Sequence, residues 1–230
     1  MILTTSKTLA EALDLKQRLG NRVPCIVENG SSVWIPAGYF AADAPEQTEV
    51  LGVPVETIRA AINALPSELR TKIRGFQDMS VEQVAAATEL DREGAERAMQ
   101  RSASEPFVWS GTDEEMDRLR ELLAGSGVFL KRGGRFYSAQ GKVDKADASR
   151  WLADRYRRLD PAKTILTVAL GDGHNDIGML KAADVGFLVE NPDAPAVKPA
   201  IQGTGIRLTG VGPAGWNQAI QSILDEQAIP

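Results

Sequence analysis

Two carboxylates stand four residues apart in a glycine-rich segment at 171–176, and both belong to residue types that bind cations. The segment carries Asp172 and Asp176 and follows an apolar run at 164–170 that is typical of a buried strand. A helix is predicted directly after it, at 178–183. In open α/β sheets, ligands bind beyond the carboxyl ends of strands, and oxygen ligands suit Mg²⁺. A glycine-rich turn with an aspartate N-cap is the alternative interpretation.

Hydroxyl and ammonium groups gather at the starts of two other predicted helices. Thr5-Ser6-Lys7-Thr8 follows a short apolar run and precedes a helical pattern, so its donors and the positive end of the helix dipole suit a phosphate. A Ser/Thr N-cap explains this segment equally well. Lys145 begins a predicted helix at 145–159, where it could stabilise charge on a transferred phosphoryl group. Taken alone, a solvated surface lysine is the better interpretation of this residue.

The composition excludes several classes of protein. The chain has 230 residues, 43% of them hydrophobic, and 26 basic residues against 31 acidic ones give a net charge of -5. This balance is typical of a globular protein and gives no overall attraction to nucleic acid or anionic membranes. The single Cys25 allows no intrachain disulfide, and the single His174 allows no His-rich metal site. Without a signal pattern or a long apolar run, we expect a cytoplasmic, reducing location.

Apolar periodicity predicts an α/β arrangement at both ends of the chain and a different pattern of helices and strands between them. A strand, a helix and two strands are expected at 2–4, 9–19, 23–27 and 33–35. Near the C-terminus the pattern predicts helices at 145–159, 178–183 and 216–224, with strands at 164–170 and 185–189. The middle contains helical patterns at 55–65, 80–89, 91–101 and 112–123, and short strands near 108 and 128. This middle part is predicted to be an inserted α+β module, preceded by a linker at 41–49.

Together the three segments resemble the haloacid dehalogenase-like phosphatases. Thr5 matches the hydroxyl residue of that family, Lys145 its lysine, and Asp172 with Asp176 its acidic loop. The inserted module resembles the large α/β cap of one branch. Within that branch, several segments are similar to the mannosyl-3-phosphoglycerate phosphatase family, and this similarity spans nearly the whole chain. They are Thr5-Ser6-Lys7-Thr8, Glu28-Asn29-Gly30, Glu105-Pro106-Phe107, Gly134-Arg135-Phe136 and the Gly171 loop.

The resemblance implies a fold, a reaction and a set of site residues. The fold would be α/β, with a Rossmann-like parallel-sheet core that lacks its first strand and an inserted α+β cap, divided as core 1–46, cap 47–139 and core 140–230. The reaction would be Mg²⁺-dependent hydrolysis of mannosyl-3-phosphoglycerate to phosphate and mannosylglycerate, a compatible solute. Catalytic roles fall to Thr5, Lys145, Asp172 and Asp176, with both aspartates as metal ligands. Substrate contacts are expected from Ser6, Lys7, Asn29, Arg101, Glu105, Arg135 and Asn175.

One motif of the family, the one that carries its nucleophile, does not occur in this sequence. The family's nucleophile is the first aspartate of an Asp-x-Asp motif, and no such motif occurs in the sequence. We therefore expect little turnover from this chain, with a truncated sequence as the simplest explanation. A different sugar-phosphate phosphatase and a binding protein without catalysis remain alternatives. A helix-turn-helix at 80–101 is a remote one, because five acidic against three basic residues give that segment a net charge of -2.

Overall fold

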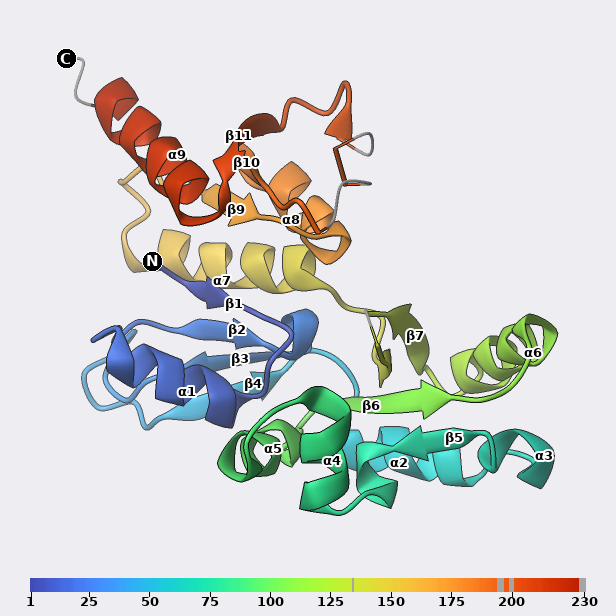
Figure 1. Cartoon of the computed structure of the whole chain (residues 1–230). Helices are drawn as coiled ribbons and strands as arrows, with labels where there is room; N and C mark the ends of the chain where they lie inside the picture. The colour runs from blue at the N-terminus through green and yellow to red at the C-terminus, as the bar shows by residue number, and fades with distance from the viewer. Residues whose placement is uncertain (134, 194–196, 199–200, 228–230) are drawn as a thin grey trace. The chain divides into compact units, whose positions relative to one another are not determined.

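Two compact units make up the fold. A computed structural model describes residues 1–133, 135–193, 197–198 and 201–227. The units are Met1–Val143 and Asp144–Pro230 (Figure 1). In the described part of the chain, no helix is both long and apolar enough to cross a membrane.

The first sheet of the N-terminal unit has the order β1-β2-β3-β4. Strands β1 (Leu3–Thr4) and β2 (Cys25–Val27) are parallel, and helix α1 (Leu9–Arg18) connects them as a crossover. Strands β3 (Ser32–Ile35) and β4 (Gln47–Val50) add to the sheet in antiparallel fashion. The short helix η1 (Glu28–Gly30) makes the turn between β2 and β3. This places Thr5 and the Glu28 turn at neighbouring strand ends, where Thr5 N–H donates to Ile26 O at 3.0 Å.

Cys25 lies in the core between α1 and this sheet. Its side chain is fully buried beside Ala12 and Trp34. Burial raises the pKa of the thiol to about 11, although the nearby Lys16 ammonium opposes the shift. At pH 8 the thiol is therefore protonated as well as inaccessible, and thiolate is the reactive form.

We therefore expect native Cys25 to resist Ellman's reagent at pH 8 and to react fully once guanidinium chloride unfolds the chain. The absorbance of the released thionitrobenzoate measures both reactions. Rapid stoichiometric labelling of the native protein would contradict this packing.

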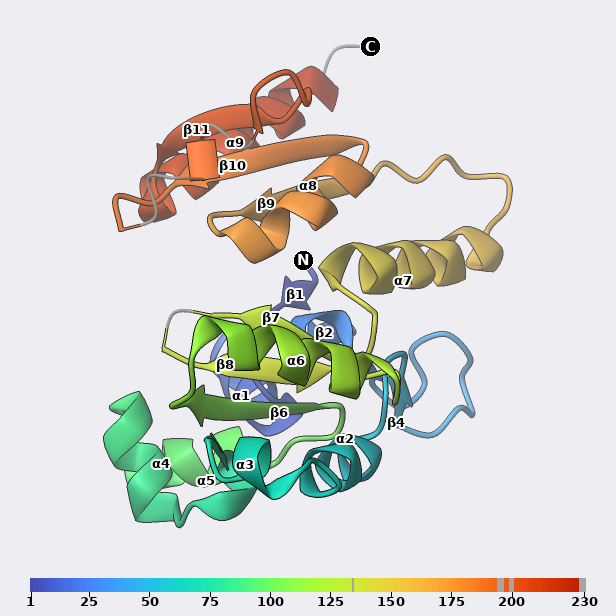
Figure 2. The same ribbon diagram turned by 90° about the vertical axis from the view of Figure 1, so that its right-hand side faces the viewer.

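A second sheet, entirely antiparallel, is formed by the middle part of the chain that is predicted to be an inserted module (Figure 2). Its order is β5-β6-β8-β7, formed by Ile73–Gly75, Ser104–Trp109, Tyr137–Gln140 and Phe129–Arg132. Helices α2 (Val55–Asn63) and α6 (Asp113–Ala124) pack their apolar residues onto Phe107 on one face of this sheet. The remaining helices are α3 (Ser67–Arg70), η2 (Phe76–Asp78), α4 (Val81–Thr88) and α5 (Arg92–Met99).

The C-terminal unit is a three-stranded parallel sheet with helices before, within and after it along the chain. Its order is β11-β10-β9, formed by Arg207–Val211, Val185–Glu190 and Val168–Gly171. Helices α7 (Lys145–Leu159), α8 (Ile177–Ala182) and α9 (Gly212–Gln227) complete it, with η3 (His174–Asp176) after β9. Its core gathers Leu180 of α8 and Leu188 of β10. The parallel strands and connecting helices confirm the predicted α/β class.

Two segments differ from the sequence-based expectation. The predicted strand 164–170 is only four residues long, at Val168–Gly171, and Leu166 before it is 45% exposed. This is because β9 lies at an edge of its sheet and pairs only with β10. The predicted linker 41–49 contains most of β4, which pairs with β3. Strand β4 thus extends the first sheet beyond residue 46, while the three-part division itself stays a prediction.

Candidate functional site

The acidic loop takes its shape from Asp176. The carboxylate Oδ2 of this residue accepts the backbone N–H groups of Asp172 and Gly173, both at 3.0 Å. The loop closes so tightly that a Cβ on Gly171 would lie 2.4 Å from the Cβ of Asp176, so no larger residue fits there without a shift. Asp176 is 5% exposed and is thus the interior support of the loop.

Lys145 reaches the same carboxylate from helix α7. Its Nζ donates to Asp176 Oδ1 at 2.5 Å, and both side chains are buried. Asp144 fixes the start of α7 by accepting the N–H groups of Ala146 at 2.8 Å and Asp147 at 3.0 Å. The structure therefore brings together two predicted residues that lie 31 positions apart in the chain.

Asp172 is the carboxylate of this loop with capacity left for a ligand. Its Oδ2 accepts the Asn191 amide at 2.8 Å, and Oδ1 has no hydrogen-bond partner among the described residues. Asn191 directly follows β10 and was missed by sequence reasoning, because a single asparagine after a strand has no distinctive spacing. The predicted ligand Asp176 has both oxygens occupied by the three donors described above. Asn175 and His174 lie in η3 between the two aspartates.

This donor set fits a magnesium ion held mainly by one carboxylate. Mg²⁺ commonly keeps several waters and binds through one or two carboxylates together with substrate phosphate oxygens. Asp172 provides such an oxygen, while the described residues contain no group of three His, Cys, Asp or Glu side chains that could hold a metal ion. The residues present therefore suit an ion whose coordination a phosphorylated ligand and water complete.

The second set of predicted residues lies in the N-terminal unit, in the loop Thr5–Thr8 before α1. Thr5 Oγ1 accepts the backbone N–H of Lys7 at 3.2 Å, which leaves its own O–H as a donor. Thr8 is the N-cap of α1 and forms a capping box with Glu11. The N-cap interpretation thus holds for Thr8, and Thr5 is a separate hydroxyl. Lys7 pairs with Glu11 at 2.8 Å but keeps a half-exposed side chain.

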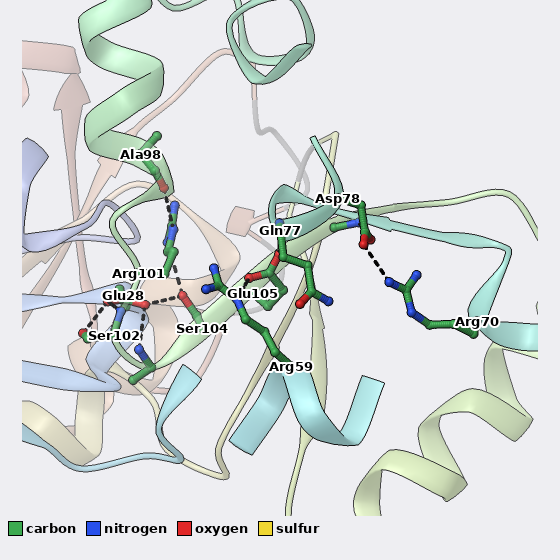
Figure 3. Close-up of polar contacts among 12 residues, drawn as sticks. Glu28, Arg59, Arg70, Gln77, Asp78, Ala98, Arg101, Ser102, Ser104 and Glu105 are labelled. Atoms are coloured by element: carbon green, nitrogen blue, oxygen red, sulfur yellow. Dashed lines mark hydrogen bonds and ion pairs between the residues drawn. The ribbon is translucent and has the colours of Figure 1, made fainter. Parts of the chain in front are cut away.

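A buried carboxylate, Glu28, anchors the segment that borders this loop (Figure 3). Glu28 is 1% exposed and accepts four hydrogen bonds at 2.5–3.1 Å from the segment Ser102–Ser104. The donors are Ser102 N–H, Ser102 O–H, Ala103 N–H and Ser104 O–H. The backbone N–H of Glu28 in turn donates to Lys7 O at 2.9 Å. The sequence singled out this position only within the segment Glu28-Asn29-Gly30, and its positive φ of 50° is consistent with a turn.

Arg101 is held within the same network. Its guanidinium donates to Ser6 O at 3.1 Å, Ser104 Oγ at 3.2 Å and Ala98 O at 2.9 Å. Burial lowers the pKa of Arg101, and the negative charges of Glu28, Glu11 and Glu105 oppose that shift. The three hydrogen bonds of this predicted substrate residue go to protein atoms, and they tie α5 to the Thr5–Thr8 loop. Asn29 lies beside the loop, where its N–H donates to Thr5 O at 2.9 Å.

Glu105 and Arg135 are engaged at separate places. Glu105 is fully buried and accepts Arg59 Nε and Gln77 N–H, each at 2.8 Å (Figure 3). Its carboxylate therefore positions Arg59 and Gln77, which sequence reasoning did not single out. Arg135 pairs with Glu89 at 2.9 Å, and both side chains are mostly exposed. The hydrogen bond that Arg135 donates to Glu89 raises the pKa of Arg135, as expected of a surface ion pair.

Sequence comparison relates the chain to known hydrolases. Residues 106–202 match the profile of the haloacid dehalogenase-like hydrolase family. A glucosyl-3-phosphoglycerate/mannosyl-3-phosphoglycerate phosphatase from Methanococcoides burtonii is 34% identical over 232 residues, covering 97% of this chain and 84% of the relative. A protein of the same name from Persephonella marina is 32% identical, covering 98% of this chain and 85% of the relative.

Comparison with solved structures supports the same fold. A phosphatase of the haloalkanoate dehalogenase superfamily from Bacteroides thetaiotaomicron matches with a TM-score of 0.64 at 18% identity. The match covers 96% of this chain and 80% of that one.

Proposed function

Because the chain belongs to the mannosyl-3-phosphoglycerate phosphatase family of haloacid dehalogenase-like hydrolases, we propose that it acts on mannosyl- or glucosyl-3-phosphoglycerate in the presence of Mg²⁺. Hydrolysis of either phosphomonoester gives phosphate and the corresponding glycosylglycerate, which in the mannosyl case serves as a compatible solute. The observation that carries the proposal is the buried Lys145–Asp176 pair in the loop that also presents Asp172.

Each residue proposed to act has a distinct task within its own unit. A bound Mg²⁺, held by Asp172, would neutralise negative charge on the phosphoryl oxygens. Asp176 shapes the loop and holds the Lys145 side chain in place. Thr5 has an O–H available to donate to a phosphoryl oxygen. We place Ser6, Lys7, Asn29 and Asn175 near the substrate, and Arg101 and Glu105 as residues that position their neighbours.

A phospho-ligand binder with little turnover is the second candidate, and the geometry of the acidic loop favours it. Both oxygens of Asp176 are occupied, and Asp172 is the proposed metal ligand, so neither carboxylate is available to attack phosphorus. The sequence contains no Asp-x-Asp motif that would supply another candidate. These residues then provide the binding and electrostatic parts of the reaction, and turnover requires a carboxylate nucleophile besides them.

Phosphate release separates the two candidates. The purified 230-residue chain would be incubated with mannosyl-3-phosphoglycerate or glucosyl-3-phosphoglycerate, with Mg²⁺ or with EDTA, and phosphate measured by molybdate colorimetry. The binding-only candidate predicts release below about one thousandth of the rate of the Methanococcoides burtonii relative, because covalent catalysis would lack its nucleophile. Rapid Mg²⁺-dependent release of phosphate would exclude the binding-only candidate and support catalysis by this chain. In that case Asp172→Asn should remove the activity, while Asp154→Asn on the exposed side of α7 should not.

A further inference from the structure

A cavity far along α1 from the Thr5–Thr8 loop contains a buried cation without a counter-charge. The cavity has a volume of about 510 Å³ and lies wholly in the N-terminal unit. Lys16 and Trp34 line it, together with Leu13, Arg22 and Pro36. Helix α1 has ten residues, or ~15 Å of length, with the loop before its first turn and Lys16 in its last turn. The cavity is thus separate from the proposed phosphate site.

Lys16 is the unusual residue of this cavity. It is 3% exposed, and its Nζ donates to Asn21 Oδ1 at 2.5 Å and to Val23 O, both neutral acceptors. In the part of the chain that the structure describes, no carboxylate pairs with it. Buried charges are normally paired, because loss of hydration is costly. Burial lowers the pKa of Lys16, which agrees with a cation that lacks a partner.

Two further groups make the cavity suited to an anion with an aromatic or apolar body. The Trp34 ring lies 5.2 Å from Lys16 Nζ, and its Nε1 is buried with no hydrogen-bond partner among the described residues. Arg22 is exposed and forms no ion pair with any described residue. Leu13 and Pro36 add apolar surface to the same cavity. The Lys16 ammonium, the Trp34 N–H and the Arg22 guanidinium together favour a compact organic molecule that carries one negative charge.

We propose that this cavity binds a small organic carboxylate, with its charge toward Lys16 and Arg22 and its apolar part against Leu13 and Pro36. Such a ligand supplies the counter-charge that Lys16 lacks. Its site is independent of the proposed phosphatase function, because it needs neither the acidic loop nor Mg²⁺.

Isothermal titration calorimetry with sodium benzoate tests the proposal on the full chain in EDTA, with benzyl alcohol as the uncharged analogue. We expect one saturable site with a Kd of about 1 mM for benzoate, and binding of benzyl alcohol at least about tenfold weaker. Lys16→Met should abolish binding, while Arg22→Met and Trp34→Phe should each weaken it about threefold or more. Arg18→Met, which removes an exposed cation from the same helix, is the matched control and should change nothing.

Three results would overturn the proposal. They are equal binding of benzyl alcohol, no benzoate binding up to about 20 mM, and unchanged binding in Arg22→Met and Trp34→Phe. Circular dichroism shows whether Lys16→Met folds. If it does not, the two other variants decide, because Arg22 is exposed and Trp34→Phe keeps an aromatic ring in the core.

Discussion

Replacement of Asp176 by asparagine should destabilise the C-terminal unit by about 3–5 kcal/mol, because the variant leaves a buried ammonium without its carboxylate. Lys145 and Asp176 have side chains that are each 7% exposed, and Lys145 forms no other ion pair among the described residues. The Nδ2 group of an asparagine would also place a donor against Nζ. Urea unfolding followed by far-UV circular dichroism measures the loss in the free energy of unfolding.

The double variant Lys145→Met/Asp176→Asn separates the charge effect from a general packing defect. With both charges gone, no uncompensated ion remains, and we expect the double variant to be more stable than Asp176→Asn alone. Asp154→Asn breaks the half-exposed pair with Arg157 on α7 and should cost no more than about 0.5 kcal/mol. A double variant less stable than Asp176→Asn would contradict the pairing.

Removal of the Glu28 carboxylate should have the second large effect. In Glu28→Ala, the backbone N–H groups of Ser102 and Ala103 lose their acceptors in a buried place. Each buried unsatisfied donor costs about 1–3 kcal/mol, so we expect a loss of about 2–6 kcal/mol in the free energy of unfolding. Since Arg101 lies between this segment and Ser6, the Thr5–Thr8 loop should also bind a phosphorylated ligand less tightly.

Glu89 provides a matched control for Glu28, because its backbone is also in the left-handed region. Glu28→Gln and Glu89→Gln both keep the side-chain shape at φ values of 50° and 63°. Glutamine at 28 turns one acceptor into a donor that faces Ser102 or Ala103, whereas Glu89 pairs only with the exposed Arg135. We expect a loss of about 1–3 kcal/mol for the first and under about 0.5 kcal/mol for the second in urea unfolding. Equal losses would show that Glu28 does not anchor the segment.

Sequence reasoning located the residues of the acidic loop because their pattern is local. Asp172 and Asp176 lie on one strand-to-helix turn, and Lys145 begins a helix whose bounds, Lys145–Leu159, agree with the prediction. The division of tasks between the two aspartates was not predictable. It depends on Asp176 facing Lys145 across 31 residues and on Asn191 reaching Asp172, and both are contacts made only by folding.

The parts missed by sequence reasoning depend on long-range pairing. Gln47–Val50 has a polar composition that favours a linker, and only pairing with β3 makes it a strand. In the sequence, Glu28 belongs to a segment of turn-forming residues, and Glu105 was predicted to contact the substrate. In the structure both carboxylates are buried, and both accept hydrogen bonds from segments at least 28 residues away. Nothing in the sequence pattern indicated that these two glutamates are buried, since a charged residue beside a strand is normally exposed.

The most direct test of the account is Mg²⁺-dependent binding of mannosyl-3-phosphoglycerate, measured by isothermal titration calorimetry on the unchanged chain, Asp172→Asn and Asp154→Asn. We expect binding that EDTA weakens and that Asp172→Asn weakens about tenfold or more, while Asp154→Asn leaves it unchanged. Binding that is indifferent to Mg²⁺ and to Asp172, or no binding at all, would contradict it.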